Sequence, residues 1–533
     1  MAAATSALTP ATAPGGPSPV AAQTLDARKL ITFIAMVFGM FMAILDIQIV
    51  SASLSEIQAG LSASSDEVAW VQTSYLIAEV IMIPLSGILS RAFSTRYLFF
   101  VSCAGFTLMS FMCSTATDIN QMIVYRALQG FIGGAMIPTV FAASYTIFPR
   151  EKQPIVAPLI GLVATLAPTI GPTVGGYLTD LFSWHWLFLV NVIPGIVVSL
   201  MAWFLIDFDK PDFSLLEKFD WFGLIGMGCF LGAMEYVLEE GPQKNWFDED
   251  LVTICFVVSI LGGLLFFWRA FTAAQPIVDL SAFKNKNFAF GSLFSFVMGV
   301  GLYGLTYIYP IYLSRVRGYS SLQIGETMFV SGLCMFVAAP IVGRLMGKVD
   351  PRVLIGIGFT GFALGTWMMS SITRDWDFWE LFVPQMLRGF SLMTAMVPIN
   401  NVALGTLPPQ RLKNASGLYN LTRNLGGAVG LACINTLIND RWDLHLARLH
   451  ESVAWGHEQA ERTLGNLTEA YARFGSDAGV AATKKLAAIV RGQALVMSLA
   501  DVFLALTVLF VVLVAVTPLM SRPGKPKAGA GAH

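Results

Sequence analysis

The stretch PLSGIL at residues 84–89 returns in altered form as PIVGRL at residues 340–345, an offset of 256 residues. A second pair keeps nearly the same offset, since QGF at residues 129–131 is matched by RGF at residues 388–390. All four stretches lie inside long apolar runs, so the chain holds two related sets of membrane helices. Parallel repeats of this kind place a substrate site near the middle of the membrane, between the two halves.

The composition excludes a soluble protein. Hydrophobic residues make up 55% of the 533 residues and charged residues 13%, whereas charged residues are roughly 25% of a soluble globular protein. The mean hydropathy is +0.66, and a soluble fold of this size could not bury so much apolar surface. The 33 basic and 34 acidic residues leave a net charge of −1, so no basic face predicts a nucleic-acid partner.

Fourteen apolar segments are long enough to cross a hydrocarbon core of roughly 30 Å at 1.5 Å per residue. They cover residues 30–52, 68–89, 97–115, 121–147, 155–180, 186–206, 220–239, 251–271, 288–313, 321–346, 353–372, 379–404, 412–438 and 494–519. We therefore expect an all-α polytopic membrane protein. Two six-helix bundles occupy residues 28–207 and 288–520, and two inserted helices occupy 208–287. Residues 1–27 and 521–533 are expected to be disordered tails.

Basic residues in the loops predict the orientation. If the N-terminus is cytoplasmic, the loops and tails on that side carry nineteen Lys and Arg residues, and the short loops on the other side carry four. The positive-inside rule then places both termini in the cytoplasm. Residues 439–491 carry seven basic residues on the outer side, but long translocated loops obey the rule weakly. We expect this polar segment to form a small external helical projection.

No pattern predicts a cofactor or a metal. The six cysteines all lie in apolar runs without a CxxC pair, which argues against disulfides and zinc. GIGFTG at residues 356–361 matches GxGxxG, but it lies in an apolar run without the βαβ context of a dinucleotide site. His445, His450 and His457 fall in a polar segment and are better explained by a solvated helix. No Walker motif is present, so ATP bound by this chain is not the energy source.

Two opposite charges are predicted to lie at similar depth in the first bundle. Asp46 is about 24 Å along its helix from the cytoplasmic face, and Arg126 is about 8 Å from the outer face along another. A charge at the bilayer centre costs roughly 2.5–3.5 kcal/mol, so such residues are usually reserved for a pathway. If the two helices are neighbours, the carboxylate lies beside the guanidinium and can load and release a proton, which makes Asp46 and Arg126 candidates for proton coupling. A structural ion pair is the alternative.

Glu79 lies near the middle of its predicted helix and shares a helical face with Gln72 and Tyr75. A polar stripe on a membrane helix must face protein or water rather than lipid. The stripe predicts a site that binds protons or a cationic compound, with Gln72 and Tyr75 in the substrate cavity. A buried structural hydrogen bond remains the alternative.

The second bundle carries its own polar stripe in Ser416, Asn420 and Arg423, and Arg388 adds a further intramembrane cation. We expect Asn420, Arg423 and Arg388 to face the cavity. Asp501 lies in the last predicted helix, where a structural role is favoured.

Tyr303 and Tyr307 recur along the first helix of the second bundle together with Thr306 and Pro310. Aromatic rings at that depth suit flat, hydrophobic substrates. We expect both tyrosines in the cavity, and an interfacial aromatic belt is the alternative.

Several stretches resemble the fourteen-helix drug:proton antiporters of the major facilitator superfamily, the EmrB/QacA type. They are LDIQIV at residues 45–50, GILSRAFSTR at 87–96, RALQG at 126–130, GPTVGG at 171–176 and WHW at 184–186. The resemblance covers roughly residues 28–520 and implies the major facilitator fold in the inner membrane. GPTVGG resembles the fifth-helix signature of exporters, so Gly171, Pro172, Gly175 and Gly176 are implied to be conformational. Proline and paired glycines permit a bend and close packing there.

The GILSRAFSTR stretch resembles the superfamily's motif between the second and third helices, which implies a gating role for Gly87, Arg91 and Arg96. Two positions depart from the usual motif. Arg91 stands where an acidic residue is usual, and Ser94 stands where Gly is usual. Gln48 and Ser51 similarly replace Thr and Asn in the first-helix motif.

Together these features predict a proton-driven exporter of hydrophobic, aromatic or cationic compounds, and not an enzyme. The resemblance also implies a periplasmic adaptor and an outer-membrane channel as partners. A proton-coupled or facilitative importer is the alternative within transport, and GPTVGG argues against it. A membrane enzyme or sensor would need a catalytic cluster or a signalling domain, and the longest polar segment, 439–491, contains neither.

Overall fold

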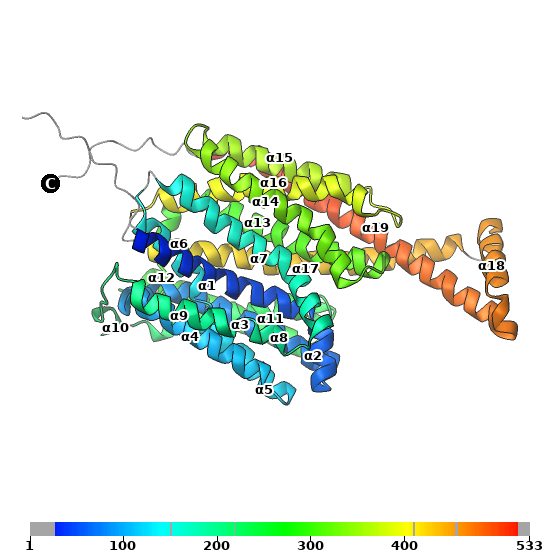
Figure 1. Ribbon diagram of the computed structural model, residues 1–533, viewed down its shortest axis with the longest axis horizontal. Helices are drawn as coiled ribbons and strands as arrows, with labels where there is room; N and C mark the ends of the chain where they lie inside the picture. Colours follow the sequence, from blue (N-terminus) through cyan, green and yellow to red (C-terminus); the bar gives the residue numbers. More distant parts are fainter. Residues whose placement is uncertain (1–26, 150–151, 218, 409–410, 454–456, 521–533) are drawn as a thin grey trace, which may run out of the picture.

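The computed structural model describes residues 27–520 except 150–151, 218, 409–410 and 454–456. Within these residues the secondary structure is helical, and the helices form two bundles that lie side by side (Figure 1). This confirms the predicted all-α fold. The expected terminal tails fall almost wholly outside the described residues.

The first bundle runs from α1 to α9. Its helices are α1 (Ala27–Ala52), the short α2 (Leu54–Leu61), α3 (Ser65–Ala92), α4 (Ser94–Ser114), α5 (Ile119–Gly133), α6 (Met136–Ile147), α7 (Gln153–Leu181), α8 (Trp186–Leu189) and α9 (Val192–Leu205). α5 with α6, and α8 with α9, each form one broken spanning element. The bundle therefore has six helical elements long and apolar enough to cross a membrane.

The inserted pair and the second bundle follow. They comprise α10 (Ser214–Glu217), α11 (Trp221–Glu240), α12 (Asp250–Thr272), α13 (Lys286–Ile311), α14 (Ser321–Met346), α15 (Pro351–Met369), α16 (Phe378–Gly405), α17 (Leu412–Ser452), α18 (Glu458–Ala470) and α19 (Ala478–Val516). α13 ends in a π-helical turn over Tyr312–Val316. This turn lies at the mouth of the cavity described below.

Twelve helical elements of the described chain are long and apolar enough to cross a membrane. The other two predicted spans correspond to α16 and α17, which carry Arg388, Asn400 and Arg423 and are less apolar for that reason. α16 packs between α14 and α15, and α17 packs between α13 and α19. The count of fourteen spans therefore stays a prediction.

The internal repeat is visible in helix packing. A Cβ atom on Gly130 would lie 2.3 Å from the carbonyl oxygen of Tyr75, and one on Gly389 would lie 2.2 Å from that of Ser331. Both glycines therefore allow equivalent helix pairs, α5 with α3 and α16 with α14, to touch backbone to backbone. The sequence repeat thus reflects a repeated packing arrangement.

The two bundles meet along α3 with α17 and along α7 with α14. The inserted helix α11 packs on α3 and also contacts α17, and α12 packs on α11. α11 therefore lies across one of the two seams between the bundles.

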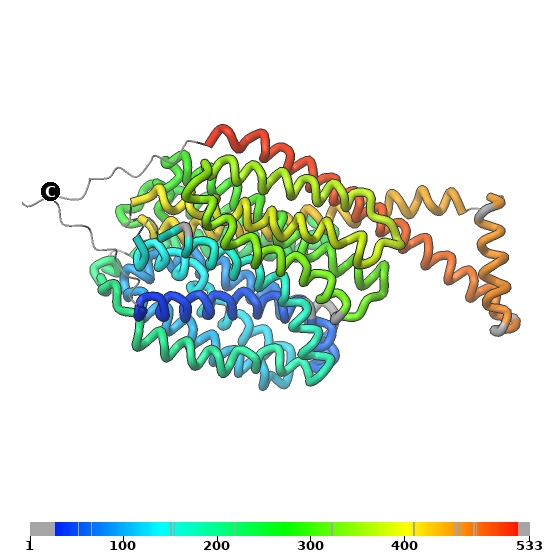
Figure 2. Tube along the Cα trace, turned by 45° about the horizontal axis from the view of Figure 1, so that its top comes forward, coloured from blue at the N-terminus to red at the C-terminus, as the bar shows by residue number. Residues whose placement is uncertain are grey.

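The described part of residues 439–491 is a helical projection, as predicted, but it is not a separate loop. α17 and α19 continue out of the bundle as an extended pair that carries α18 at its tip (Figures 1 and 2). Both helices are consequently longer than the predicted spans 412–438 and 494–519. The start of α1 (blue) and the end of α19 (red) lie at the opposite end of the bundles (Figures 1 and 2). We call these two ends the projection end and the termini end.

Candidate functional site

Asp46 and Arg126 form an ion pair in the interior of the first bundle. Arg126 Nη1 lies 2.6 Å from Asp46 Oδ2, and both side chains are 0% exposed. Asn191 Nδ2 donates to the other carboxylate oxygen at 2.7 Å, and Gln129 Oε1 accepts from Arg126 Nη1 at 2.8 Å. The structure thus brings the predicted pair together, and removing one partner of such a pair typically costs about 3–5 kcal/mol.

Tyr75 packs on this ion pair rather than lining a cavity. The Arg126 guanidinium carbon lies 4.2 Å from the centre of the Tyr75 ring, which is a cation–π distance. Tyr75 is fully buried, and its hydroxyl has no hydrogen-bond partner among the described residues. Its position supports the guanidinium, so the expectation of a cavity tyrosine here is not met.

A cavity of about 660 Å³ lies between the bundles. Residues from α1, α3, α7, α13 and α17 line it, and so does α11 of the inserted pair. The predicted residues in its lining are Gln72, Glu79, Pro172, Tyr303 and Tyr307. Its mouth includes three exposed residues at the projection end: Glu56 in α2, Gln243 after α11 and Arg315 in the π-helical turn after α13. The cavity therefore reaches from the membrane interior toward that end.

Glu79 reaches the cavity as a nearly bare carboxylate. Its side chain is 3% exposed, and Oε1 has no hydrogen-bond partner in the described part of the chain. Gln72, two helical turns away on α3, likewise presents an unpartnered Oε1 to the cavity and is 7% exposed. Buried polar atoms without partners are rare in native proteins, and both atoms can accept hydrogen bonds from a molecule in the cavity.

Two further glutamates line the same cavity, and sequence reasoning missed them. Glu235 and Glu239 lie one turn apart on α11. The signal was present, because two carboxylates within the apolar segment 220–239 carry the same cost as Asp46. They were overlooked because the inserted pair has no counterpart in the internal repeat.

Arg388 and Arg423 are buried but stand behind the cavity lining. Arg388 Nη2 donates to Thr306 Oγ1 at 2.7 Å, and Arg423 Nη2 donates to Asn420 Oδ1 at 2.7 Å. Neither guanidinium forms an ion pair with a carboxylate among the described residues. Glu79 is near enough to Arg423 for the two charges to attract each other. Asn420 is fully buried, and its side-chain oxygen accepts the hydrogen bond from Arg423. The structure does not place these three predicted residues in the cavity wall.

The two halves carry the same pair of side chains in exchanged order. In α5, Arg126 is followed three residues later by its acceptor Gln129, whereas in α16 Gln385 precedes Arg388. The internal repeat aligns these positions, so the exchange was readable from the sequence. Among the described residues, Arg126 faces an aspartate and Arg388 does not, which makes the two halves electrostatically unequal.

Tyr303 and Tyr307 both line the cavity from α13. The Tyr303 ring packs against Gly427 of α17, where an added Cβ would lie 2.4 Å from the ring. Tyr307 is more open, with 38% of its surface exposed. Both rings are available to an apolar or aromatic molecule in the cavity.

The GPTVGG segment brings α7 against α1. A Cβ on Gly171 would lie 2.4 Å from Gln48 Cβ, and one on Gly175 would lie 2.8 Å from the Ile49 carbonyl oxygen. Gly176 is buried beside them. α7 continues as a helix through Pro172, which lines the cavity. Close approach is therefore the feature of this motif that the structure displays.

The termini end is closed by contacts between the bundles. Lys413 of α17 forms an ion pair with Asp209 and donates to the Ser90 carbonyl oxygen at 3.0 Å. Ser416 Oγ donates to the Pro138 carbonyl oxygen at 2.9 Å. Sequence reasoning did not identify Asp209, which also accepts from the Thr95 backbone at the start of α4. The cavity is consequently shut off from this end.

The predicted gating residues lie beside this closure. A Cβ on Gly87 would lie 2.9 Å from the Asn414 Cα, so α3 and α17 touch there. Arg96 pairs with Asp207 at 3.3 Å, and Arg91 Nε has no partner in the described part of the chain. Asp209 thus supplies the acidic contact near the position where Arg91 replaces the motif's usual acid.

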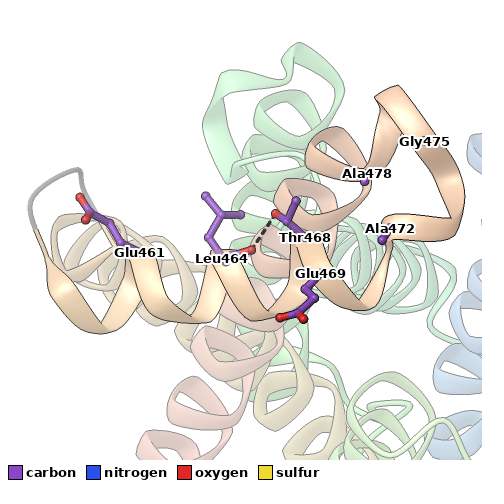
Figure 3. A pocket seen from close by; sticks show the side chains of 8 residues that line it. Glu461, Leu464, Thr468, Glu469, Ala472, Gly475 and Ala478 are labelled. Atoms are coloured by element: carbon purple, nitrogen blue, oxygen red, sulfur yellow. Dashed lines mark hydrogen bonds between the residues drawn. The ribbon is translucent and has the colours of Figure 1, made fainter.

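A second hollow of about 770 Å³ lies on the projection, between α18 and the start of α19 (Figure 3). Its lining is small or apolar apart from Thr468 and two glutamates, Glu461 and Glu469. It contains none of the intramembrane charges. No group of three His, Cys, Asp or Glu residues able to hold a metal occurs in the described chain.

Comparison with known proteins gives concordant relatives. Residues 36–431 match the family model described as Major Facilitator Superfamily. The chain is 43% identical over 495 residues to the colistin resistance protein EmrB of Acinetobacter baumannii, covering 92% of this chain and 96% of that relative. It is 29% identical over 514 residues to the multidrug export protein EmrB of Escherichia coli (strain K12), covering 95% and 98% respectively.

A solved structure gives the same fold. The human organic anion transporter MFSD10 (TETRAN) superposes with a TM-score of 0.56 at 12% sequence identity. The superposition covers 91% of this chain and all of that one. At this identity the likeness bears on the fold alone.

Proposed function

This chain belongs to the Major Facilitator Superfamily, and on that premise we propose that it is a proton-driven antiporter of hydrophobic, aromatic or cationic compounds. Its relatives include multidrug export proteins, and its family and fold are those of transporters rather than enzymes. One observation supports the proposal most. A cavity between the bundles is open toward one end and closed at the other, and a buried ion pair lies beside it.

The direction follows from the proposed orientation. With both termini in the cytoplasm and the protein in the inner membrane, the closed end is cytoplasmic and the cavity opens outward. Alternating access then requires the Lys413–Asp209 contact to break as the bundles rock. Export proceeds when the cavity loads from the inner side and releases outward.

Asp46 is our proposed proton carrier. Protonation would neutralise its carboxylate and weaken the contact with Arg126 and Asn191, which join α1 to α5 and α9. The next two residues of α1, Ile47 and Gln48, line the cavity. A change of charge at Asp46 can therefore alter the position of the cavity wall.

The test is transport by purified protein in proteoliposomes, with and without an imposed pH gradient. Asp46→Asn keeps the side-chain shape and removes the titratable group. We expect it to lose gradient-driven dye transport at least 20-fold while keeping equilibrium dye exchange. Asp46→Glu keeps an acid and should retain part of the driven transport. Wild-type driven transport by Asp46→Asn would remove this residue as the carrier, and Glu79 would be tested next.

The projection is the proposed contact for accessory proteins. With the assigned orientation, the extensions of α17 and α19 with α18 lie outside the membrane, where a periplasmic adaptor and an outer-membrane channel would complete an export route. Deleting α18 should leave transport in proteoliposomes intact and lower resistance in cells.

A further inference from the structure

The inserted helix α11 is fastened to both bundles. Thr73 Oγ1 of α3 donates to Glu240 Oε1 at 3.2 Å, and Trp70 stacks on Tyr236 with ring centres 5.2 Å apart. Beyond its C-terminal end, Trp246 Nε1 donates to Thr436 Oγ1 of α17 at 3.0 Å. α11 is therefore a fixed part of the cavity wall where the two bundles separate.

This wall is acidic. Glu235 and Glu239 are four residues apart, so they share one face of α11, and both line the cavity with Glu79 of α3. Glu235 is 6% exposed, and the carboxyl groups of Glu79 and Glu239 are near enough to repel it when they are charged. Neither Glu235 nor Glu239 forms a hydrogen bond or an ion pair with another described residue. Three carboxyl groups from two helices thus meet one space without a protein partner.

The only cation in the described cavity lining is Arg315, which lies at the mouth. Gathering like charges in a desolvated site is unfavourable unless a cation or protons neutralise them. Glu79 is 3% exposed and its Oε1 has no hydrogen-bond partner among the described residues, which is an independent sign of a polar binding site there.

We propose that Glu79, Glu235 and Glu239 form the recognition site for the positively charged group of organic cations, with Tyr303 and Tyr307 holding the aromatic or apolar body. The proposal rests on the proposed function and deepens it, because it assigns substrate selection to the inserted helix pair. The tyrosines line the same cavity from α13 and can add cation–π and stacking contacts.

Asp46 takes no part in this recognition. Both of its carboxylate oxygens already accept hydrogen bonds, one from Arg126 and one from Asn191. Among the described residues, none donates a hydrogen bond to the carboxyl group of Glu79, Glu235 or Glu239. The protein therefore separates the proposed proton site, inside the first bundle, from the cation site at the seam covered by α11.

The test measures binding to the purified full-length protein in detergent at one fixed pH, without a gradient. The probes are ethidium as the cation, N-phenyl-1-naphthylamine as the neutral compound and 8-anilinonaphthalene-1-sulfonate as the anion. We expect Glu235→Gln and Glu239→Gln each to raise the Kd of ethidium at least 10-fold. The Kd of the neutral probe should change less than 2-fold, which also reports an intact fold.

Glu326→Gln is the matched control, because Glu326 is an exposed glutamate of α14 that carries the same charge and is not among the residues lining the cavity. It should change ethidium binding less than 2-fold. Equal weakening of all three probes, unchanged ethidium binding in both α11 variants, or wild-type preference for the anion would each overturn the proposal. Because binding is measured without a pH gradient, this experiment tests the cation site independently of proton coupling, which the transport assay of Asp46→Asn tests.

Discussion

At the scale of single residues, the structure locates strain where the sequence departs from its motif. Ser94 has φ of +73°, in the left-handed region that favours glycine. It is also buried, at the junction between α3 and α4. The motif's usual glycine would take this conformation freely, whereas a residue with a Cβ loses roughly 1–2 kcal/mol there.

Ser94→Gly should therefore stabilise the protein by about 1 kcal/mol. Ser90→Gly is the matched control, because Ser90 lies inside α3 and the same change there should destabilise by about 0.5–1 kcal/mol. Thermal unfolding in detergent, followed by tryptophan fluorescence, would compare the two. A lower Tm for Ser94→Gly than for the wild type would show that other contacts of this serine outweigh the strain.

At the scale of helices, the GPTVGG motif predicts close packing of α7 but not whether the helix bends. GPTVGG predicts tight contact, and α7 does touch α1 at Gly171 and Gly175. The motif does not predict that α7 continues as a helix through Pro172. Whether a membrane helix bends at a proline depends on its contacts with neighbouring helices. These contacts cannot be predicted from the sequence of that helix alone.

Gly171→Leu should leave membrane insertion intact and abolish export, because no side chain fits between α7 and Gln48. Gly356→Leu is the control, since a Cβ there meets nothing within 4 Å. Resistance assays and the yield of folded protein would be measured for both. Normal efflux by Gly171→Leu would show that the close approach is dispensable for the transport cycle.

At the scale of the whole molecule, the repeat and the apolar runs predicted the two bundles and the inserted pair, and the polar segment 439–491 predicted the helical projection. The similar depth of Asp46 and Arg126 was predictable because depth along a helix follows from residue counting. Lateral neighbours do not follow from it, so Arg388 and Arg423 were placed in the cavity when they stand behind its wall. The contribution of α11 was missed for the same reason, since only packing shows which seam it covers.

The closure of the termini end depends on charge carried by both halves. Lys413 and Asp209 are largely buried and oppositely charged, so their contact holds the bundles together at that end. Asp209→Lys or Lys413→Asp replaces attraction by repulsion, and the double variant restores it with reversed polarity. A charge-assisted contact contributes about 1.5 kcal/mol, so each single variant should open this end roughly tenfold more often.

A cysteine introduced as Ser416→Cys would report the opening, because Ser416 is 1% exposed and lies between the bundles at the closed end. Cys229, Cys255, Cys334 and Cys433 would first be replaced by alanine, since they are the native cysteines that are not buried. Labelling by a maleimide should be about tenfold faster in each single variant and return to the starting rate in the double variant. The double variant restores the attraction between opposite charges. Fast labelling that persists in it would mean that the close fit of the original side chains, rather than their charge, closes the termini end.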